Sequence, residues 1–428
     1  MKYIKEILIC FFCVIITTGH AQEKRVLTFN DYLNNVKQSN IDYLVEKYNV
    51  DIAEANVKAA KVFPDPELSV SYANNQNWDL QMGYGVDAEL NYTLELGGKR
   101  KARINVAKSE KEMTDALLED YFRNLRADAT IAYLAAVKQN RLYEIQKESY
   151  RQMFMLAQAD SVRLSVGEIK EIDARQSKLE AATMLNDVYT SENDLKEVLL
   201  QLALFQGDKN IELSDSIAGD LNDYKRVFDL ASLITAAQNN RADLQVALKS
   251  RELSHNNLRL AKANRAIDVG ISLGGTYSSI VKNEIAPAPA FKGFSVGFSI
   301  PLKLSNTNKG ELRAAEFAAA QSKSQYEGVE LQITSEVMQA YNKYTTACRK
   351  MEQFNSGLLH EAETIFHKQV YSYERGESSI LEVLNAQRTY NEILVSYNET
   401  LFDCATTLVE LERASGIWDI RIDSTEEN

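Results

Sequence analysis

The most constraining feature of the sequence is a stretch of strict alternation that runs into a glycine pair and then into a very long helical pattern. From Tyr84 to Leu94 every second side chain is apolar, and the residues between are polar or glycine. A β-strand turns this period of two into one apolar and one polar face. Gly97-Gly98 and a basic run follow, and a helical pattern without proline then begins. The chain is therefore predicted to change from strand to helix at the glycine pair.

The same alternation recurs in the second half of the chain, from Phe294 to Leu302. Each such strand is preceded by another candidate strand and by a polar or proline-rich loop. The pattern predicts two β-hairpins, at 66–94 and 267–302. Strands of about 10 residues with one apolar face have the length and pattern that a membrane β-barrel needs.

Two long helical patterns, 99–163 and 310–373, follow the hairpins. Each would reach about 90 Å at 1.5 Å per residue. Both end at similar glycine turns, VRLSVGEIKEID and VYSYERGESSILE, and a shorter helical pattern at 27–61 matches one at 228–262, with Leu33 aligned to Leu233 and Asn40 to Asn240. The chain is therefore predicted to be a tandem structural repeat, 22–215 and 216–428, in which each copy holds a helix, a β-hairpin and a long helical hairpin.

Residues 1–21 have the features of a secretory signal peptide, with two lysines, an apolar core and a small residue at the expected cleavage site. No other segment has about 18 consecutive apolar residues, so strands are the expected route across a membrane. Cys10 and Cys13 lie in the signal. Cys348 and Cys404 remain, and they either pair or stay as buried thiols.

The formal net charge of −12 argues against nucleic acid as a partner. Gly97-Gly98-Lys99 does not continue as a phosphate loop, and the His360-Glu361 pair lacks the second histidine of a zinc-protease helix, since residue 364 is Thr. No catalytic residue, cofactor or metal site is expected, so the chain is not predicted to be an enzyme. The basic run has two open interpretations, a contact with lipid headgroups or a plain solvated cluster: Lys99, Arg100, Lys101 and Arg103.

Four strands cannot close a membrane barrel, because an open edge leaves backbone groups unpaired in lipid. Three chains would supply twelve strands. The expected fold is an α+β membrane protein, a homotrimeric 12-stranded β-barrel with four strands per chain, continued by a long α-helical barrel. Its lumen is expected to carry polar side chains that include Asp87, Glu89, Asn91 and Asp268, and aromatic side chains near the strand ends are expected to meet the lipid interface.

Several motifs together, FPDPELSVSY, LELGGKRKAR, NRADLQVA, GFSIPLKL and YERGESSILEVLNAQ, resemble the TolC family of outer-membrane efflux proteins over essentially the whole mature chain. The ELGGKR variant is most similar to the heavy-metal branch of that family. The resemblance implies a trimeric channel in the outer membrane of a Gram-negative cell that extends into the periplasm. It also implies a periplasmic adaptor and an inner-membrane efflux pump, of the RND type, as partners, and passive passage of metal cations or drugs.

The resemblance also implies a gate at the periplasmic end, carried by Asp173, Tyr373 and Glu382. The chain departs from drug-exporting relatives at Ser378, where they can have arginine, and at Asn385, where they have a second acid. An alternative role for Asp173 and Glu382 is simply to cap helices. The turns at the hairpin tips would dock the adaptor: Gly167, Glu168, Gly376, Glu377 and Ser379.

Two other functions remain open from the residues alone. One is a periplasmic or surface coiled-coil structural protein whose strands cap a rod. The other is a secreted pore-forming toxin. A resident channel requires detergent for extraction and is a trimer, whereas a toxin begins as a water-soluble monomer.

Overall fold

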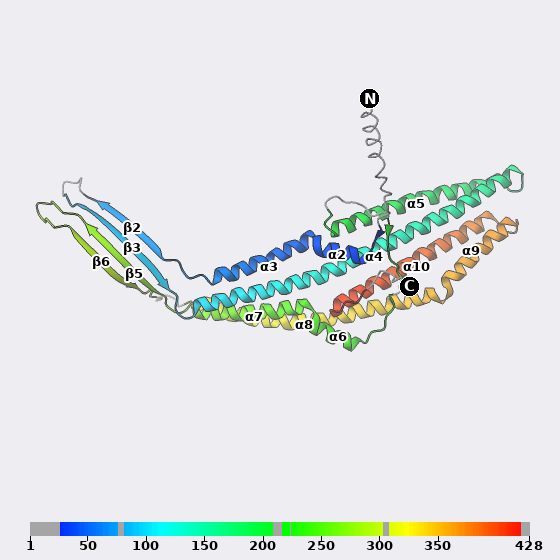
Figure 1. The fold of residues 1–428 in the computed structure, drawn as a ribbon. Coiled ribbons are helices and arrows are strands. Elements are labelled where there is room, and N and C mark those ends of the chain that lie inside the picture. The colour runs from blue at the N-terminus through cyan, green and yellow to red at the C-terminus, as the bar shows by residue number, and fades with distance from the viewer. Residues whose placement is uncertain (1–25, 76–80, 209–215, 223, 303–307, 421–428) are drawn as a thin grey trace, which may run out of the picture.

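The computed structural model describes residues 26–75, 81–208, 216–222, 224–302 and 308–420, so the predicted signal peptide lies outside the described residues. The molecule is long and narrow (Figure 1). A curved β-sheet forms one end, parallel rods of helix form the middle, and two helical hairpins form the other end. Strand, rod and hairpin tip are thus spread along one axis.

Each half of the chain passes through the same series of elements. The first half contains β1 (Val26–Leu27), α2 (Phe29–Ser39), α3 (Ile41–Ala60), β2 (Glu67–Asn74), β3 (Tyr84–Leu94), α4 (Lys99–Ser165) and α5 (Glu171–Phe205). The second half contains β4 (Ser216–Ile217), α6 (Leu230–Asn240), α7 (Ala242–Ala263), β5 (Val269–Ser278), β6 (Phe291–Ser299), α8 (Lys309–Gln353), η1 (Phe354–Leu358), α9 (Leu359–Glu374) and α10 (Ile380–Ser415). This order confirms the tandem architecture; the division at residue 215 stays a prediction.

The four long strands form one antiparallel sheet in the order β2-β3-β5-β6. The two predicted hairpins are present as β2–β3 and β5–β6, and they join edge to edge through the pairing of β3 with β5. A short parallel pair, β1 with β4, links the starts of the two repeats. The strands β2 and β6 remain as open edges within one chain.

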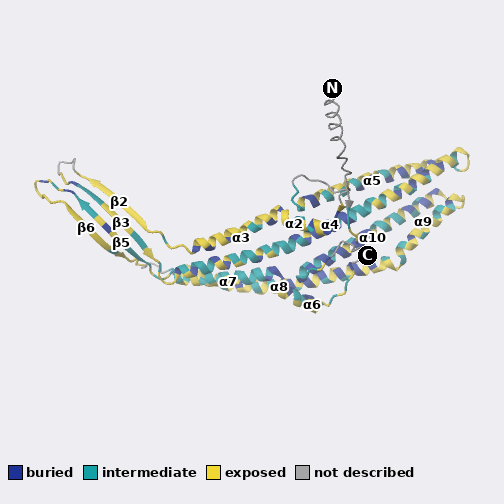
Figure 2. Ribbon diagram, in the orientation of Figure 1, coloured by how far each residue is buried: buried dark blue, intermediate teal, exposed yellow. Residues whose placement is uncertain are grey.

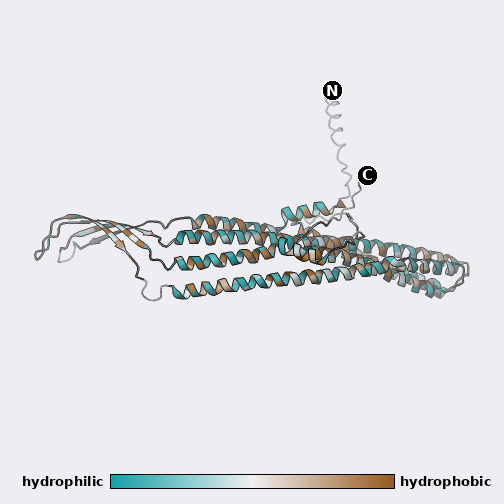
Figure 3. Cartoon of the chain, turned by 90° about the horizontal axis from the view of Figure 1, so that it is seen from below, coloured by the Kyte–Doolittle hydropathy of each residue, from teal (hydrophilic) through white to brown (hydrophobic). Residues whose placement is uncertain are grey.

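The helices below the sheet repeat its lateral order. Contacts run from α3 to α4, from α4 to α7 and from α7 to α8, so these four rods lie side by side (Figure 3). Further from the sheet, α4 pairs with α5, and α9 pairs with α10. Within the described part of the chain, none of the helices combines the length and the apolarity that a membrane span requires.

The shorter helical patterns differ from the prediction, because each breaks into two helices. The first breaks at Asn40, whose side chain caps α3 by accepting a hydrogen bond from the Tyr43 amide at 2.9 Å. The second breaks at Arg241, not at Asn240, so the aligned pairs Leu33–Leu233 and Asn40–Asn240 are wrong by one position. The cause is tertiary: both breaks are held by carbonyls of distant helices.

These carbonyls belong to the ends of the returning helices. Asn40 donates to the Phe205 carbonyl at 3.0 Å, and Arg241 donates to the Ala414 carbonyl at 3.1 Å. Gly207 has a φ of +64°, and a Cβ there would lie 2.2 Å from the Ser39 carbonyl oxygen. Glycine is required at this helix end because it permits both the left-handed conformation and the close approach to the break.

The second long rod also differs from the prediction of one continuous helix. Where α4 runs unbroken for 67 residues, the corresponding rod is interrupted by the π-helical segment η1. Gly357 within η1 has a φ of +120°, which side chains other than glycine rarely adopt. This local widening bends the path of the rod between α8 and α9 (Figure 1).

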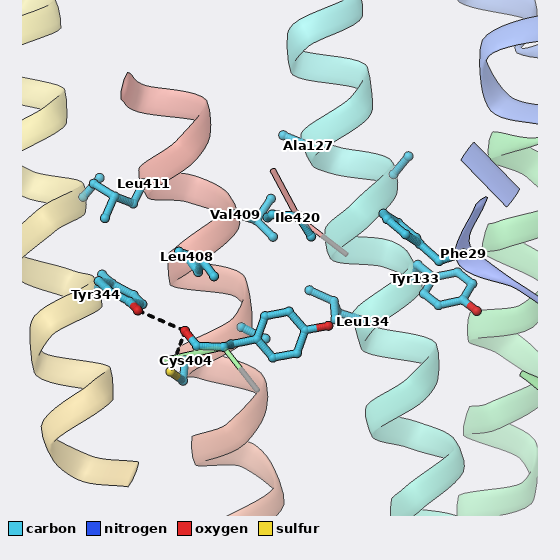
Figure 4. Close-up of a cluster of buried hydrophobic side chains, with 14 of the residues drawn as sticks. Phe29, Ala127, Tyr133, Leu134, Tyr344, Cys404, Leu408, Val409, Leu411 and Ile420 are labelled. Atoms are coloured by element: carbon cyan, nitrogen blue, oxygen red, sulfur yellow. Dashed lines mark hydrogen bonds between the residues drawn. The ribbon is translucent and has the colours of Figure 1, made fainter. Parts of the chain in front are cut away.

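The main hydrophobic core lies midway along the molecule, where dark buried positions gather on α4, α8 and α10 (Figure 2). Two buried tyrosines tie the chain segments there (Figure 4). The Tyr133 hydroxyl lies 2.8 Å from the Leu27 carbonyl oxygen, and the Tyr344 hydroxyl lies 2.9 Å from the Tyr224 carbonyl oxygen. These contacts anchor the segments at the start of each repeat to the long rods.

Candidate functional site

One face of the sheet is polar across all four strands. The register aligns Ser71, Asp87, Thr276 and Gly293 in one row, and Ser69, Glu89, Gly274 and Ser295 in the next. The Asp87 carboxylate accepts hydrogen bonds from Thr276 at 2.6 Å and from Ser71 at 3.4 Å. Asn91 occupies a third polar row, with Glu67, Ser272 and Gly297. Carboxylates, hydroxyls and glycines on one continuous surface make that surface suited to water and cations.

The opposite face is apolar in the same register. Leu68, Leu90, Leu273 and Val296 form one row across the sheet. Near the free end of the sheet, Tyr84 lies between Tyr72 and Tyr277, with ring centroids 6.1 Å and 5.9 Å apart. An apolar band bounded by tyrosines is the pattern of a surface that meets lipid.

Asp268 lies just outside the paired strands that form this polar face, and its place in the lumen stays a prediction. It precedes β5 and accepts hydrogen bonds from Lys99 at 2.6 Å and from the Leu96 amide at 3.1 Å. Its role is therefore to join the start of β5 to the turn that ends β3. The sequence could not show this, because the partners lie in the other repeat.

The basic run after the glycine pair also has a structural role. Lys99 is buried against Asp268, and Arg103 forms a two-point pair with Glu95. Arg100 donates to the Lys61 carbonyl and lies 3.9 Å from the Phe63 ring centroid. Cations at a helix C-terminus satisfy its last carbonyls. Arg100 thus fastens the end of α3 to the start of α4, while Lys99 and Arg103 bind acidic residues beside the strand ends. Lys101 is exposed, and contact of this run with lipid headgroups stays a prediction.

At the far end of the molecule both hairpins turn in the same way. Gly167 and Gly376 have φ angles of +79° and +75°. The Glu168 amide donates to the Arg163 carbonyl, and the Glu377 amide donates to the Ser372 carbonyl, each at 2.9 Å. This is the Schellman arrangement, which requires glycine in the left-handed position. Each turn presents one exposed acidic residue at its tip, Glu168 in the first hairpin and Glu377 in the second.

Tyr373 joins the two hairpins. Its side chain is buried, and its hydroxyl donates to Asp160 on α4 at 3.0 Å. Asp160 is fully buried, and its Oδ2 has no hydrogen-bond partner among the described residues. The Arg163 guanidinium lies 3.8 Å from Asp160 and 5.2 Å from the Tyr373 ring centroid. Burial, together with the negative charge of Asp160, raises the pKa of Tyr373 above its ordinary value, so the hydroxyl stays a donor.

The other predicted gate residues are placed differently from one another. Asp173 is half-buried in the first turn of α5, and its charge acts on Tyr373. Glu382 lies in the first turn of α10, where it forms a capping box with Ser379 and accepts a hydrogen bond from Gln369 at 3.0 Å. Asn385 is exposed and lines a groove between α9 and α10 together with Glu382. Asp173 thus lies where its charge acts on Tyr373, whereas Glu382 caps its own helix and also contacts α9.

Comparison with known proteins decides the family. The model of the outer membrane efflux protein family matches residues 32–207 and 233–416, most of the chain and one match per repeat. The chain belongs to the outer membrane efflux protein family. It is 23% identical over 391 residues to the cobalt-zinc-cadmium resistance protein CzcC of Cupriavidus metallidurans, with 89% of each protein covered.

Solved structures of outer membrane channels share the fold of this outer membrane efflux protein. CusC matches with a TM-score of 0.75 and 16% identity, covering 94% of this chain and 96% of that one. CmeC of Campylobacter jejuni matches with a TM-score of 0.73 and 15% identity, covering 90% and 85%. These structures show the fold, and membership of the outer membrane efflux protein family makes the chain the outer-membrane channel of a tripartite efflux system. Three copies form the β-barrel and the helical barrel that extends into the periplasm, where an adaptor and an inner-membrane pump complete the system.

This assignment replaces the coiled-coil structural protein and the pore-forming toxin as interpretations. Among the described residues, no group of three or more His, Cys, Asp or Glu side chains is placed to hold a metal ion. Asp160 and Arg163, which form the contact between the hairpins with Tyr373, were not predicted from the sequence. Their only sequence signal is an acid and a base one helical turn apart, which is common on any exposed helix.

Proposed function

We propose that this channel conducts divalent metal cations passively, without chemical change, from an inner-membrane pump of the RND type to the exterior. The observation that carries the proposal is the polar face of the sheet, where Asp87 and Glu89 lie in adjacent rows. In the trimer this face lines the lumen, and three copies of each acid attract cations. The similarity to a cobalt-zinc-cadmium resistance protein supports metals over drugs as cargo.

A deletion strain tests the cargo. Loss of the gene should raise sensitivity to cobalt, zinc or cadmium salts, and the wild-type gene should restore resistance. A deletion strain that is sensitive to organic drugs and indifferent to these metals would overturn the proposal in favour of drug export. Co-purification of the adaptor and pump from the complemented strain identifies the pump class.

Planar bilayers test the acidic lumen directly. The double variant D87N/E89Q should shift the reversal potential in a salt gradient toward less cation preference, because it removes six carboxylates per trimer. The variant D65N, which lies in the connection between α3 and β2, is the matched control and should leave the reversal potential unchanged. An unchanged potential in the double variant would place the selectivity elsewhere in the channel.

We also propose that Asp173, Tyr373, Glu382 and Asn385 belong to the gate at the periplasmic end. The Tyr373–Asp160 hydrogen bond supports a closed state because it holds the two hairpins of one subunit together. The variants D173A and E382A should each reduce cation selectivity if their carboxylates line the constriction. If E382A lowers thermal stability but leaves cation selectivity unchanged, Glu382 acts only as the cap of α10 that its hydrogen bonds form.

The hairpin tips are the proposed docking surface for the adaptor, with the acids Glu168 and Glu377 beside the turn glycines and Ser379 behind them. Charge reversal at both acids, E168K/E377K, should weaken adaptor binding in a pull-down while the trimer remains intact. The lipid of the outer membrane is the proposed partner of the apolar face of the sheet. Reconstitution into liposomes of the trimer, but not of a monomer, is the expected result.

A further inference from the structure

The described part of the chain contains two cysteines, and the fold brings them together. Cys348 lies on α8 and Cys404 on α10, separated by 56 positions in the sequence. Their Sγ atoms are 3.6 Å apart, and both side chains are buried in the main core, with exposed fractions of 9% and 0%. Two antiparallel helices thus face each other through a pair of thiols.

The surroundings make the cysteine thiols unreactive once the protein has folded. The Cys404 Sγ lies 3.9 Å from the Tyr224 carbonyl oxygen, which also accepts a hydrogen bond from the Tyr344 hydroxyl (Figure 4). Leu401 and Leu408 on the same helix are also buried in this cluster. Burial, together with the neighbouring sulfur, raises the pKa of Cys404 to about 12, so a thiolate is disfavoured once the core has formed.

We propose that Cys348 and Cys404 form a disulfide bond in the exported protein. The inference rests on the location of the outer membrane efflux protein, because the periplasm is an oxidising compartment. Both cysteines are free thiols in the structure, and the sulfur atoms must approach by roughly 1.5 Å to reach the bonding distance of about 2.05 Å. The sequence alone left open whether the two cysteines pair, and the structure assigns them to each other.

The reaction requires an oxidant of the thiol–disulfide oxidoreductase class. One cysteine, as thiolate, attacks the oxidant's disulfide and forms a mixed disulfide; the second cysteine then displaces the oxidant. The two thiols lose two protons and two electrons, and the oxidant is left as a dithiol. Because the sulfurs are buried in the finished fold, the bond must form before α8 and α10 are fully packed.

The bond would close a loop that contains η1, α9 and the second hairpin tip. It would fix the base of that hairpin in the core and leave η1 and the tip outside the fixed part. Closing a loop of this length stabilises the protein mainly by restricting the unfolded chain. The loop contains η1 and α9, so the bond would stabilise the second repeat, whose long rod is interrupted.

Mass spectrometry tests the proposal. The protein is exported to the outer membrane, purified without reductant, denatured and treated with iodoacetamide. If the disulfide is present, neither cysteine is alkylated before reduction, and the protein gains two carbamidomethyl groups after reduction. Proteolysis without reductant then yields a disulfide-linked pair of peptides that contain residues 348 and 404. Alkylation of both cysteines without reductant in functional outer-membrane trimers would overturn the disulfide and leave the efflux function standing.

Matched variants separate the bond from the burial of sulfur. Reductant should lower the Tm of the wild-type trimer, whereas the Tm of C348S/C404S should not respond to reductant. The single variants C348S and C404S should each show the loss that the reduced wild type shows. Equal Tm values for reduced and oxidised wild type would contradict the proposed stabilisation. Export in a strain that lacks the periplasmic dithiol oxidase should yield the protein with both thiols reduced.

Discussion

At the scale of single residues, the side chains that matter most here act through partners far away in the sequence. The Tyr373 hydroxyl donates a hydrogen bond to Asp160 in the first repeat, and Asp268 in the second repeat binds Lys99 in the first. Glu412 is fully buried on α10, where it contacts Arg226 from the segment between β4 and α6 and accepts a hydrogen bond from the Asp419 amide. Each of these polar contacts is one that burial makes costly to lose.

The first prediction concerns the bond between the hairpins. Y373F removes the hydroxyl and leaves the buried Asp160 carboxylate without that donor, which should cost about 1–3 kcal/mol of hairpin contact. We expect a higher open probability in single-channel recordings. The matched control is Y371F on the same helix, whose ring is exposed and whose hydroxyl contacts only Arg375 in the described residues. Equal open probabilities in both variants would remove Tyr373 from the gate.

The second prediction concerns pH. Burial raises the pKa of Glu412 to about 8, and this outweighs the opposing pull of Arg226. An acid with a raised folded pKa favours the folded state while it is protonated, so its contribution is full below the unfolded pKa of about 4.3 and is lost as pH rises through 8. The Tm of the wild type should therefore fall between pH 5 and 9, and E412Q should flatten that fall.

Glu410 supplies the control for this pH experiment. It lies on the same helix and pairs with Arg413, but it is partly exposed. E410Q should keep the wild-type slope of Tm against pH. A slope in E412Q that equals the wild-type slope would mean that Glu412 is ionised throughout this range.

At the scale of secondary-structure elements, the two long rods differ although their sequences are related. The first rod, α4, is one helix of 67 residues, whereas the second is α8, η1 and α9. Only the second rod contains a residue with positive φ inside the helical run, Gly357, among those described. A π-helical segment weakens the ladder of backbone hydrogen bonds locally, so flexing is expected at η1 and not at the middle of α4.

The third prediction tests this difference. G357A forces an alanine into a conformation that costs about 1–3 kcal/mol, so the rod should lose stability around η1. Hydrogen exchange should show faster exchange of the η1 amides. The control is G328A in the middle of α8, where nothing lies within 4 Å of the new methyl group and where alanine should stabilise the helix by about 0.5–1 kcal/mol. Similar exchange in both variants would contradict a hinge at η1.

At the scale of the whole molecule, one chain is incomplete by itself. The strands β2 and β6 are the open edges of the sheet, and the rods α3 and α8 are the open edges of the helical layer. The outer face of α3 carries large apolar side chains at helical spacing that are exposed in one chain, with 65% of Tyr48 and 57% of Ile52 accessible. The trimer explains both observations, since each edge meets the opposite edge of the next copy.

The fourth prediction follows from the face of α3. Burial of such side chains contributes about 1.5–3 kcal/mol each, so Y48E/I52E should weaken the trimer and leave more monomer in detergent. Native electrophoresis and crosslinking measure the ratio. K58E adds the same kind of charge to a solvated position of the helix and should leave the ratio unchanged. A stable trimer in the double variant would place the subunit contact on another face of α3.

The sequence by itself determined the periodic features of this protein. Strand alternation, helix length and the glycine turns at Gly167 and Gly376 are local properties, set by side-chain period and by backbone angles that only glycine readily adopts. For that reason the two hairpins, the unbroken first rod, the tandem architecture and the need for three chains could all be predicted without coordinates.

Only the tertiary structure decided the contacts between distant segments. The helix breaks at Asn40 and Arg241 depend on carbonyls of α5 and α10, and the junction of Lys99 with Asp268 depends on the pairing of β3 with β5. No local pattern encodes such contacts, because each partner by itself is an ordinary surface residue. The approach of Cys348 to Cys404 has the same origin: the packing of α8 on α10 sets it, not the spacing of the cysteines along the chain.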